Sequence, residues 1–237
     1  MSHINSHIFL ISILVLCAVA NAWSAEKDWT NSSGDRLWRT ADNWSGGVPT
    51  SDDKAAIRNS AISGPIIDAS TAAEANQVVL GDWASTSDTL DITGGTLAVR
   101  EWFILGYYNI NSGTFTITDG TVNASGNLFV GFYGTGILNM SGGTVTVGST
   151  FGVAQQTGGT GNVHLDGGTI SCGSFNMTSG GRLDITAGTL IVNGDARTAI
   201  NGYIGSGWIT AYGGGTVKVD YNVINPGKTT MYAAALS

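Results

Sequence analysis

The sequence predicts an all-β fold, a single-stranded parallel β-helix (β-solenoid) that we expect to be right-handed and three-sided. One phrase, Gly-Thr followed by an apolar residue, any residue and a second apolar residue, occurs six times at intervals of 20 to 27 residues. A repeat of that length is one supersecondary unit, which buries its apolar side only by stacking on the next copy. The phrases begin at Gly95, Gly120, Gly143, Gly168, Gly188 and Gly215.

Three short strands are expected in each repeat. A stretch of alternating apolar and polar residues precedes each of the first five phrases, and period two places the apolar side chains on one face of a strand. A third apolar stretch in each repeat ends at a Val-Gly or Leu-Gly corner, as at 79–81 and 104–106. No Asn-Gly or Asp-Gly turn joins these strands at hairpin spacing, which favours parallel stacking over a meander or sandwich. The alternating stretches are 90–92, 115–117, 138–140, 163–165 and 183–185.

Composition agrees with a folded β protein rich in corners and excludes several partners. The chain has 35 Gly and 3 Pro in 237 residues, with 42% hydrophobic and 11% charged residues. It contains too much glycine for a helical protein and too much apolar content for a disordered one. Because the net charge is −7 and no basic run occurs, we expect neither nucleic acid nor a membrane as a partner of the mature chain.

The chain divides into three segments. Residues 1–22 are typical of a secretory signal peptide, because the apolar run at 8–19 is too short to span a bilayer and a small-x-small cleavage site follows it. Residues 23–62 form a distinct N-terminal segment, and residues 63–237 carry the parallel β-helix repeats. We therefore expect a secreted protein that is extracellular or held at the cell surface.

The N-terminal segment is expected to cap the first coil. Trp29, Trp38 and Trp44 lie within 16 residues of one another and need an apolar surface to bury against. An open solenoid end exposes its core and its unpaired strand edges, so a cap there protects both. The charged residues 52–54, Asp-Asp-Lys, are interpreted as solvated residues that guard this end.

Removal of the signal peptide leaves Cys172 as the only cysteine, so the mature chain forms no intramolecular disulfide. Cys172 occupies the last apolar slot of its phrase, as Val147 and Val192 do in the neighbouring repeats, which predicts a core residue. The mature chain has a single histidine and neither an EF-hand loop nor a calcium-binding nonapeptide repeat. We expect no cofactor and no metal.

One outward column of the repeats holds the candidate catalytic residues. Aligning the alternating strands places His164 between Asn139 and Asp184, one coil away on each side, with Asp166 two residues along its own strand. Carboxylates beside an imidazole can fix its tautomer or raise its pKa, as acid and base catalysis requires. Outward solenoid positions are commonly filled by short polar residues, so we favour a structural interpretation of this column over a catalytic one.

Large aromatic residues recur at the Val-Gly and Leu-Gly corners. Trp83, Tyr108 and Tyr133 take the same position after the corner in three successive repeats, and Tyr107 and Phe132 precede the two tyrosines. If the side chains of Trp83, Tyr108 and Tyr133 face outward, they form a ligand-binding strip suited to stacking on the apolar faces of sugars. Rings on neighbouring strands also stabilise a sheet by about 0.2–1 kcal/mol a pair. We favour this structural role, and both interpretations stay open.

The N-terminal segment also carries a family resemblance. The sequence at 43–49, Asn-Trp-Ser-Gly-Gly-Val-Pro, followed by Asp-Lys-Ala-Ala-Ile at 53–57 and by Gly-Gly-Thr-rich repeats, resembles secreted bacterial β-solenoid proteins. It is similar to autotransporter passenger repeats and to PEP-CTERM surface proteins of planctomycetes. The resemblance implies an architecture and a secretion habit but no catalytic residues. The Pro-Glu-Pro sorting tail of those proteins is missing, so we expect either a short, freely secreted member or a fragment of a longer protein.

Three functions are compatible with these features. The leading expectation is a non-enzymatic extracellular solenoid that acts as a surface, matrix or adhesion module. The alternatives are a carbohydrate-binding module and a polysaccharide lyase or hydrolase, of which the last rests on analogy of fold alone. The expected partners are an extracellular polysaccharide or cell-surface matrix, together with end-to-end self-association through an open coil edge.

Overall fold

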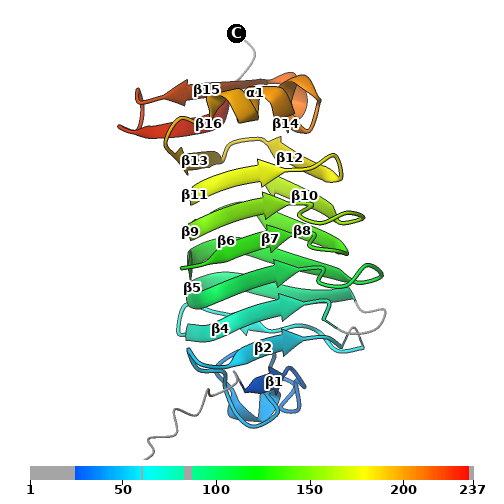
Figure 1. Ribbon diagram of the computed structural model, residues 1–237. Helices are drawn as coiled ribbons and strands as arrows, with labels where there is room; N and C mark the ends of the chain where they lie inside the picture. The colour runs from blue at the N-terminus through cyan, green and yellow to red at the C-terminus, as the bar shows by residue number, and fades with distance from the viewer. Residues whose placement is uncertain (1–24, 60, 83–86, 235–237) are drawn as a thin grey trace, which may run out of the picture.

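The computed structural model describes residues 25–59, 61–82 and 87–234, which form a β-solenoid of about 7 turns. The coils rise in a single stack from the N-terminal segment to the C-terminal one (Figure 1). The front strands run from left to right as the chain climbs, which is the sense of a right-handed coil (Figure 1). The predicted parallel β-helix is therefore confirmed. The predicted signal peptide, residues 1–22, and Trp83 lie outside the described residues.

The strands line three sides of the coil, and several of them bend at a corner so that one strand serves two sides. The first sheet contains β3 (Ile66–Ile67), the starts of β5 (Ser87–Leu105) and β6 (Ser112–Ala124), then β8 (Thr135–Met140), β10 (Thr160–Leu165), β12 (Gly181–Ile185) and β14 (Ile209–Ala211). The second sheet contains the start of β4 (Ala72–Leu80), later parts of β5 and β6, the starts of β9 (Thr144–Val153) and β11 (Thr169–Met177), and β13 (Thr189–Asn193). The third sheet contains β1 (Glu26–Asp28), β2 (Lys54–Ile57), the ends of β4, β5, β9 and β11, and β7 (Asn127–Val130).

Equivalent residues of successive coils pair with one another, so that like side chains stack in columns. Cys172 pairs with Val147 on one side and Val192 on the other, and all three side chains are buried in one continuous core. Burial in this apolar column raises the pKa of the Cys172 thiol to about 12. The predicted core position of Cys172 is confirmed.

Glycine is required at the corner where the third sheet turns into the first sheet of the next coil. Gly106 adopts a positive φ of 68°, and a Cβ atom there would lie 2.3 Å from the backbone oxygen of Thr135 in the neighbouring coil. Gly131, one coil later, has a φ of 79° and would place a Cβ atom 2.1 Å from the Thr160 oxygen. Both the backbone conformation and the close approach of the next coil therefore exclude a side chain.

The N-terminal cap is a tryptophan cluster, as predicted. The ring centroid of Trp44 lies 5.0 Å from that of Trp29 and 4.7 Å from that of Trp38, both in edge-to-face geometry. The Trp44 indole donates a hydrogen bond to the Trp38 carbonyl at 2.8 Å. The short 3₁₀ segment η1 (Ala41–Asn43) leads into Trp44 and holds it in this position.

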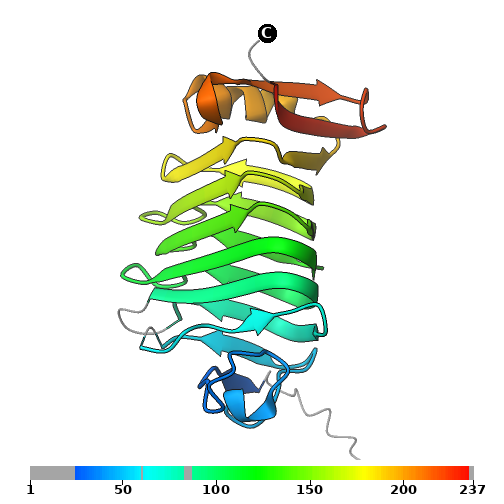
Figure 2. The ribbon, with the colours of Figure 1, turned by 180° about the vertical axis from the view of Figure 1, so that it is seen from behind.

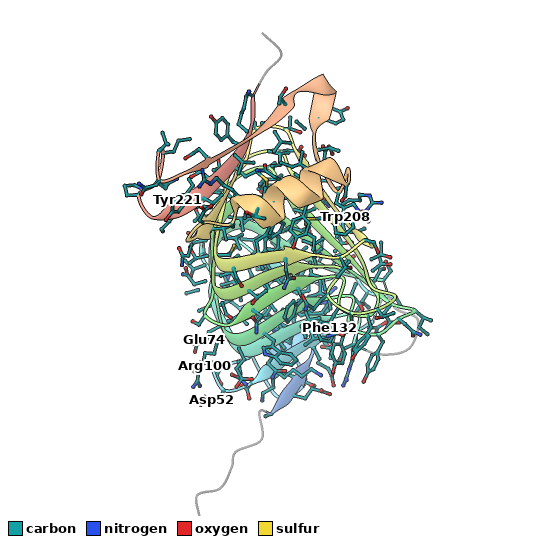
Figure 3. All side chains as sticks on the ribbon, turned by 45° about the horizontal axis from the view of Figure 1, so that its top comes forward. Asp52, Glu74, Arg100, Phe132, Trp208 and Tyr221 are labelled. Carbon is teal, nitrogen blue, oxygen red and sulfur yellow. The ribbon has the colours of Figure 1, made fainter. Side chains whose placement is uncertain are left out.

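The interpretation of residues 52–54 as solvated guards is wrong for two of the three. Asp53 is buried, and its carboxylate accepts hydrogen bonds from the Thr50 backbone at 2.9 Å and from the Thr50 hydroxyl at 2.7 Å. Lys54 lies in the third sheet and forms ion pairs with Glu26 at 2.9 Å and with Asp82. Asp52 is exposed at the edge, where it pairs with Arg100 at 2.5 Å (Figure 3).

The C-terminal segment differs from the predicted continuation of parallel repeats to residue 237. The sixth Gly-Thr phrase lies in β15 (Thr216–Tyr221), which pairs with β16 (Lys228–Ala234) in an antiparallel hairpin, and β16 is itself antiparallel to β13. The phrase specifies one apolar face of a strand, and an antiparallel strand satisfies that pattern as well as a parallel one does. Helix α1 (Arg197–Gly205) lies across the end of the stack, between the labelled Tyr221 and Trp208 in Figure 3, and buries Ile200 in the core. The core is therefore covered at this end, where an open coil edge was expected.

Two corner glycines provide a matched test of in-register stacking. Gly106→Ala and Gly158→Ala both place a Cβ atom on a residue with positive φ, 68° and 89°, but only Gly106 would contact the next coil. We expect Gly158→Ala to lower the free energy of unfolding by about 1–2 kcal/mol, and Gly106→Ala to lower it by clearly more. Urea unfolding measures both, and equal losses would contradict the proposed steric role of the neighbouring coil.

The cap is expected to weaken in acid through Asp35. Hydrogen bonds to its carboxylate, from the Thr40 hydroxyl first and from the Leu37 backbone N–H next, hold its pKa well below the usual range. Such a group stabilises the fold above its unfolded pKa of about 3.9 and loses that contribution as the pH falls toward the folded value. Asp35→Asn should therefore lower the melting temperature at neutral pH, and the difference from the native chain should shrink below about pH 4.

Asp42→Asn is the matched control for this measurement. Asp42 is exposed in the same segment, and its carboxylate accepts no hydrogen bond from the residues that the structure describes. The melting temperature of this variant should follow that of the native chain at every pH. A difference for Asp35→Asn that stays constant from neutral to acidic pH would refute the role given to Asp35.

Candidate functional site

The two described tyrosines of the predicted strip come from the loops that join the third sheet to the first. These loops project from one edge of the stack in both ribbon views (Figures 1 and 2). Tyr108 and Tyr133 lie at equivalent positions of two successive loops and are 46% and 43% exposed. Their predicted outward orientation is confirmed, and Trp83, the third predicted member, lies outside the described residues.

A buried layer supports these two tyrosines from below. The outward column of the third sheet carries Val79, Ile104 and Phe129 in register, and these side chains form an apolar cluster outside the main core. Tyr107 and Phe132 fold back over that column, with their rings stacked at a centroid distance of 5.8 Å. The cluster therefore gives the loops a fixed seat on the sheet.

Each exposed ring is held against a ring of this layer. Tyr108 contacts Tyr107 at 4.7 Å between centroids, and Tyr133 contacts Phe132 at 5.0 Å, both edge to face. Burial raises the pKa of Tyr107, so its phenol stays neutral. Because their neighbours are packed, Tyr108 and Tyr133 lose little conformational freedom when they bind a ligand.

Sequence reasoning missed a third exposed ring, Trp102. It lies in β5, in an outward column between Gln77 and Asn127, and is 40% exposed. Its ring lies 6.4 Å from Phe129 and 6.3 Å from Phe132. The alternation of the strand could have predicted its outward orientation, because Trp102 is two residues before the outward Ile104. We refer to Trp102, Tyr107, Tyr108, Phe132 and Tyr133 as the aromatic surface; Phe132 is labelled in Figure 3.

Toward the N-terminus, the aromatic surface borders a network of ion pairs between two cations and three carboxylates. Lys54 and Arg58 lie among Glu26, Asp28 and Asp82, with Arg58 at 2.5 Å from both Glu26 and Asp28. Burial alone would lower the pKa of Lys54, but its hydrogen bonds to Asp82 and Glu26 outweigh this and raise it. Asp82 starts the loop one coil before that of Tyr107. Its carboxylate is thus paired with the cations Lys54 and Arg58.

Toward the C-terminus, the aromatic surface borders a polar groove. The groove has a volume of about 540 Å³ and lies between the loop 155–160 and the turn 178–180. Gln155 and Gln156 take the places in their coil that Phe132 and Tyr133 take one coil earlier. The lining consists of amide, hydroxyl and backbone groups, contributed by Gln155, Gln156, Thr157, Gly158, Gly159, Thr160, Thr178, Ser179 and Gly180.

The predicted histidine column is present on the first sheet. His164 pairs with Asn139 and with Asp184, and its side chain is exposed. A second groove, of about 420 Å³, brings three of the four candidate catalytic residues together, while Asn139 is not part of its lining. The lining residues are His164, Asp166, Asp184, Thr186 and Tyr212. Tyr212, in the 3₁₀ segment η2 (Tyr212–Gly214), is 70% exposed and was not predicted.

The hydrogen bonds in this groove connect coils and do not orient the histidine. The Thr186 hydroxyl donates to Asp166 at 2.7 Å, and the Thr210 hydroxyl donates to Asp184 at 2.7 Å. The imidazole of His164 makes no hydrogen bond to any residue in the described part of the chain. A general base needs a partner that fixes its tautomer and direction, and neither carboxylate supplies one here.

Neither a cluster of metal ligands nor a membrane-spanning helix occurs among the described residues. Within residues 25–59, 61–82 and 87–234, no three His, Cys, Asp or Glu side chains come together as metal ligands would. In the same ranges, no helix has both the length and the apolar character needed to cross a bilayer. The helix α1 has nine residues.

Comparison with known proteins adds no assignment to this geometry. No family model, curated protein or solved structure matches the chain. The resemblance to autotransporter passengers and PEP-CTERM surface proteins therefore stays a prediction. The aromatic surface and the two grooves are the candidate functional features of the chain.

Proposed function

We propose that this chain is a non-enzymatic extracellular β-solenoid that adheres to a surface or matrix polysaccharide through its aromatic surface. The observation that carries the proposal is the exposure of Trp102, Tyr108 and Tyr133 on a packed aromatic layer. Solvent-facing rings fixed in place on a rigid scaffold are typical of binding sites for ligands with apolar faces.

Sugar rings are the ligands that best fit these side chains. One face of a pyranose presents C–H groups that stack on an aromatic ring, while its hydroxyl groups need polar partners at the edge. Tyr and Trp provide both, because each combines a large apolar ring with one polar group. Gln77 and Asn127 flank Trp102 and bring amides beside the rings. The Gln77 amide donates to the Glu101 carboxylate at 2.9 Å, and the Asn127 oxygen accepts from the Thr150 N–H at 3.1 Å. Adhesion to a polysaccharide would thus use both the apolar faces and the polar groups of these rings.

The structural role favoured from the sequence accounts for only part of the aromatic residues. Tyr107, Phe129 and Phe132 bury apolar area and stack on one another, which stabilises the sheet. Tyr108 and Tyr133 leave nearly half of their surface in water and add little burial. Their exposure supports a contact with a partner.

The alternative of a polysaccharide lyase or hydrolase has one favourable observation. The groove at His164 does hold two carboxylates, those of Asp166 and Asp184, beside the exposed ring of Tyr212. Hydrolysis requires one acid and one base or nucleophile at opposite sides of the bond. Both carboxylates accept a threonine hydroxyl in the same way, so nothing distinguishes one as the acid. We expect no cleavage at this groove.

Loss of the exposed tyrosines should weaken retention on polysaccharide. Tyr108→Ala and Tyr133→Ala each remove one stacking ring, and we expect each to reduce affinity roughly three- to tenfold. Tyr212→Ala is the matched control, since Tyr212 is also exposed but lies in the groove of the first sheet. Affinity electrophoresis through gels containing single polysaccharides measures the three variants beside the native protein.

Two outcomes would overturn the proposed function. Retention that is unchanged in Tyr108→Ala and Tyr133→Ala, or that falls equally in Tyr212→Ala, would remove the aromatic surface from the binding site. Release of reducing ends that disappears in His164→Ala or Asp184→Ala would establish an enzyme at the other groove.

A further inference from the structure

The polar groove continues the aromatic surface directly. The loop at 155–160 stacks on the loop at 131–134, with the Gln155 N–H donating to the Gly131 oxygen at 2.9 Å and the Gln156 N–H donating to the Phe132 oxygen at 3.0 Å. The turn at 178–180 is attached in the same way, since the Thr178 hydroxyl donates to the Ala154 oxygen at 2.6 Å. Rings and groove therefore form one edge that spans four successive coils, a length of roughly 14 Å at the spacing of β-strands.

The chemistry changes along this edge from rings to amides and hydroxyls. At the first loop position, Tyr107 and Phe132 are followed by Gln155, and at the second, Tyr108 and Tyr133 are followed by Gln156. An extended ligand on this edge would stack its apolar faces at one end and form hydrogen bonds at the other. Alternating C–H faces and hydroxyl groups are the defining pattern of a glycan chain.

No residue of the aromatic surface or of the groove lining carries a formal charge. The nearest cation along the chain, Arg182, is bound to the backbone, with its guanidinium donating to the Ser179 oxygen at 3.0 Å and the Gly181 oxygen at 2.6 Å. At the other end, Asp82 is paired with Lys54. The lining itself therefore offers no opposite charge to a uronate, sulfate or ammonium group, and the net charge of −7 further disfavours a polyanion.

We propose that the aromatic surface and the polar groove together form one extended site for an uncharged glycan, lying along the axis of the solenoid. This inference rests on the proposed function and adds the class of polysaccharide and the second half of the site. The rings supply most of the affinity by stacking. The amide and hydroxyl groups at 155–157 and 178–179 select hydroxyl groups over charged substituents.

Pairs of polysaccharides that share a backbone and differ in charge provide the test. Hydroxyethyl cellulose is compared with carboxymethyl cellulose, and dextran with dextran sulfate, by affinity electrophoresis of the full chain at low and high NaCl. We expect retention by a neutral member, weaker retention by its charged counterpart, and little change with salt. Tighter binding of a charged member, or binding that falls steeply with salt, would overturn the inference.

Variants of the groove test its part in the site. Gln156→Ala and Thr157→Ala remove a side-chain amide and a hydroxyl, and we expect each to weaken binding of the neutral member roughly three- to tenfold. Gln156→Glu should weaken it further if the glycan packs closely, because it buries a charge without a partner. Thr146→Ala, at an exposed position of the second sheet, is the control. Melting temperatures of all variants confirm that they fold.

The two proposals fail in different ways. Retention that depends on Tyr108 and Tyr133 but is unaffected by the groove variants, or is stronger for a charged member, would remove the inference and keep the proposed function. If none of the four polysaccharides is retained, or if retention does not depend on the two tyrosines, both are overturned.

Discussion

In-register stacking of the coils is the constraint on which the rest of this structure depends. Parallel backbone hydrogen bonds between coils place each residue over its counterpart one repeat away. Such stacking is possible only where the corners let neighbouring backbones approach closely, and at Gly106 and Gly131 there is no space for a side chain. Each residue therefore contributes to a column of stacked side chains. An inward residue extends the core, and an outward residue extends a surface.

The candidate site follows from one column that breaks the usual pattern. Outward positions of the third sheet become apolar at Val79, Ile104 and Phe129, and apolar side chains there need cover. The corner loops provide it by folding Tyr107 and Phe132 back over the sheet, which leaves the following residue of each loop in solvent. Exposure of the tyrosines is thus a consequence of how the sheet is covered. One coil after Phe129, the same column position is taken by Gly152. The corner loop of that coil carries glutamines, and the surface there is polar.

The sequence predicted those features that depend on period and register alone. The buried place of Cys172 and the outward place of His164 follow from period two, and both are observed. Features that do not follow from period and register were missed. Asp53 is buried and accepts hydrogen bonds from Thr50 three residues earlier, and Tyr212 reaches the His164 groove from a 3₁₀ segment distant in sequence. The C-terminal hairpin was missed because a Gly-Thr strand pattern defines an apolar face and carries no information on the direction of its neighbour.

The C-terminal cap leaves the three sides of the solenoid at different heights. Among the described residues, the first sheet stops at β14 and the third at β11, while the second extends past β13 by the two strands of the hairpin. On the second side, the edge of β13 is already occupied by an antiparallel strand, so no parallel coil can pair with it unless the hairpin moves away.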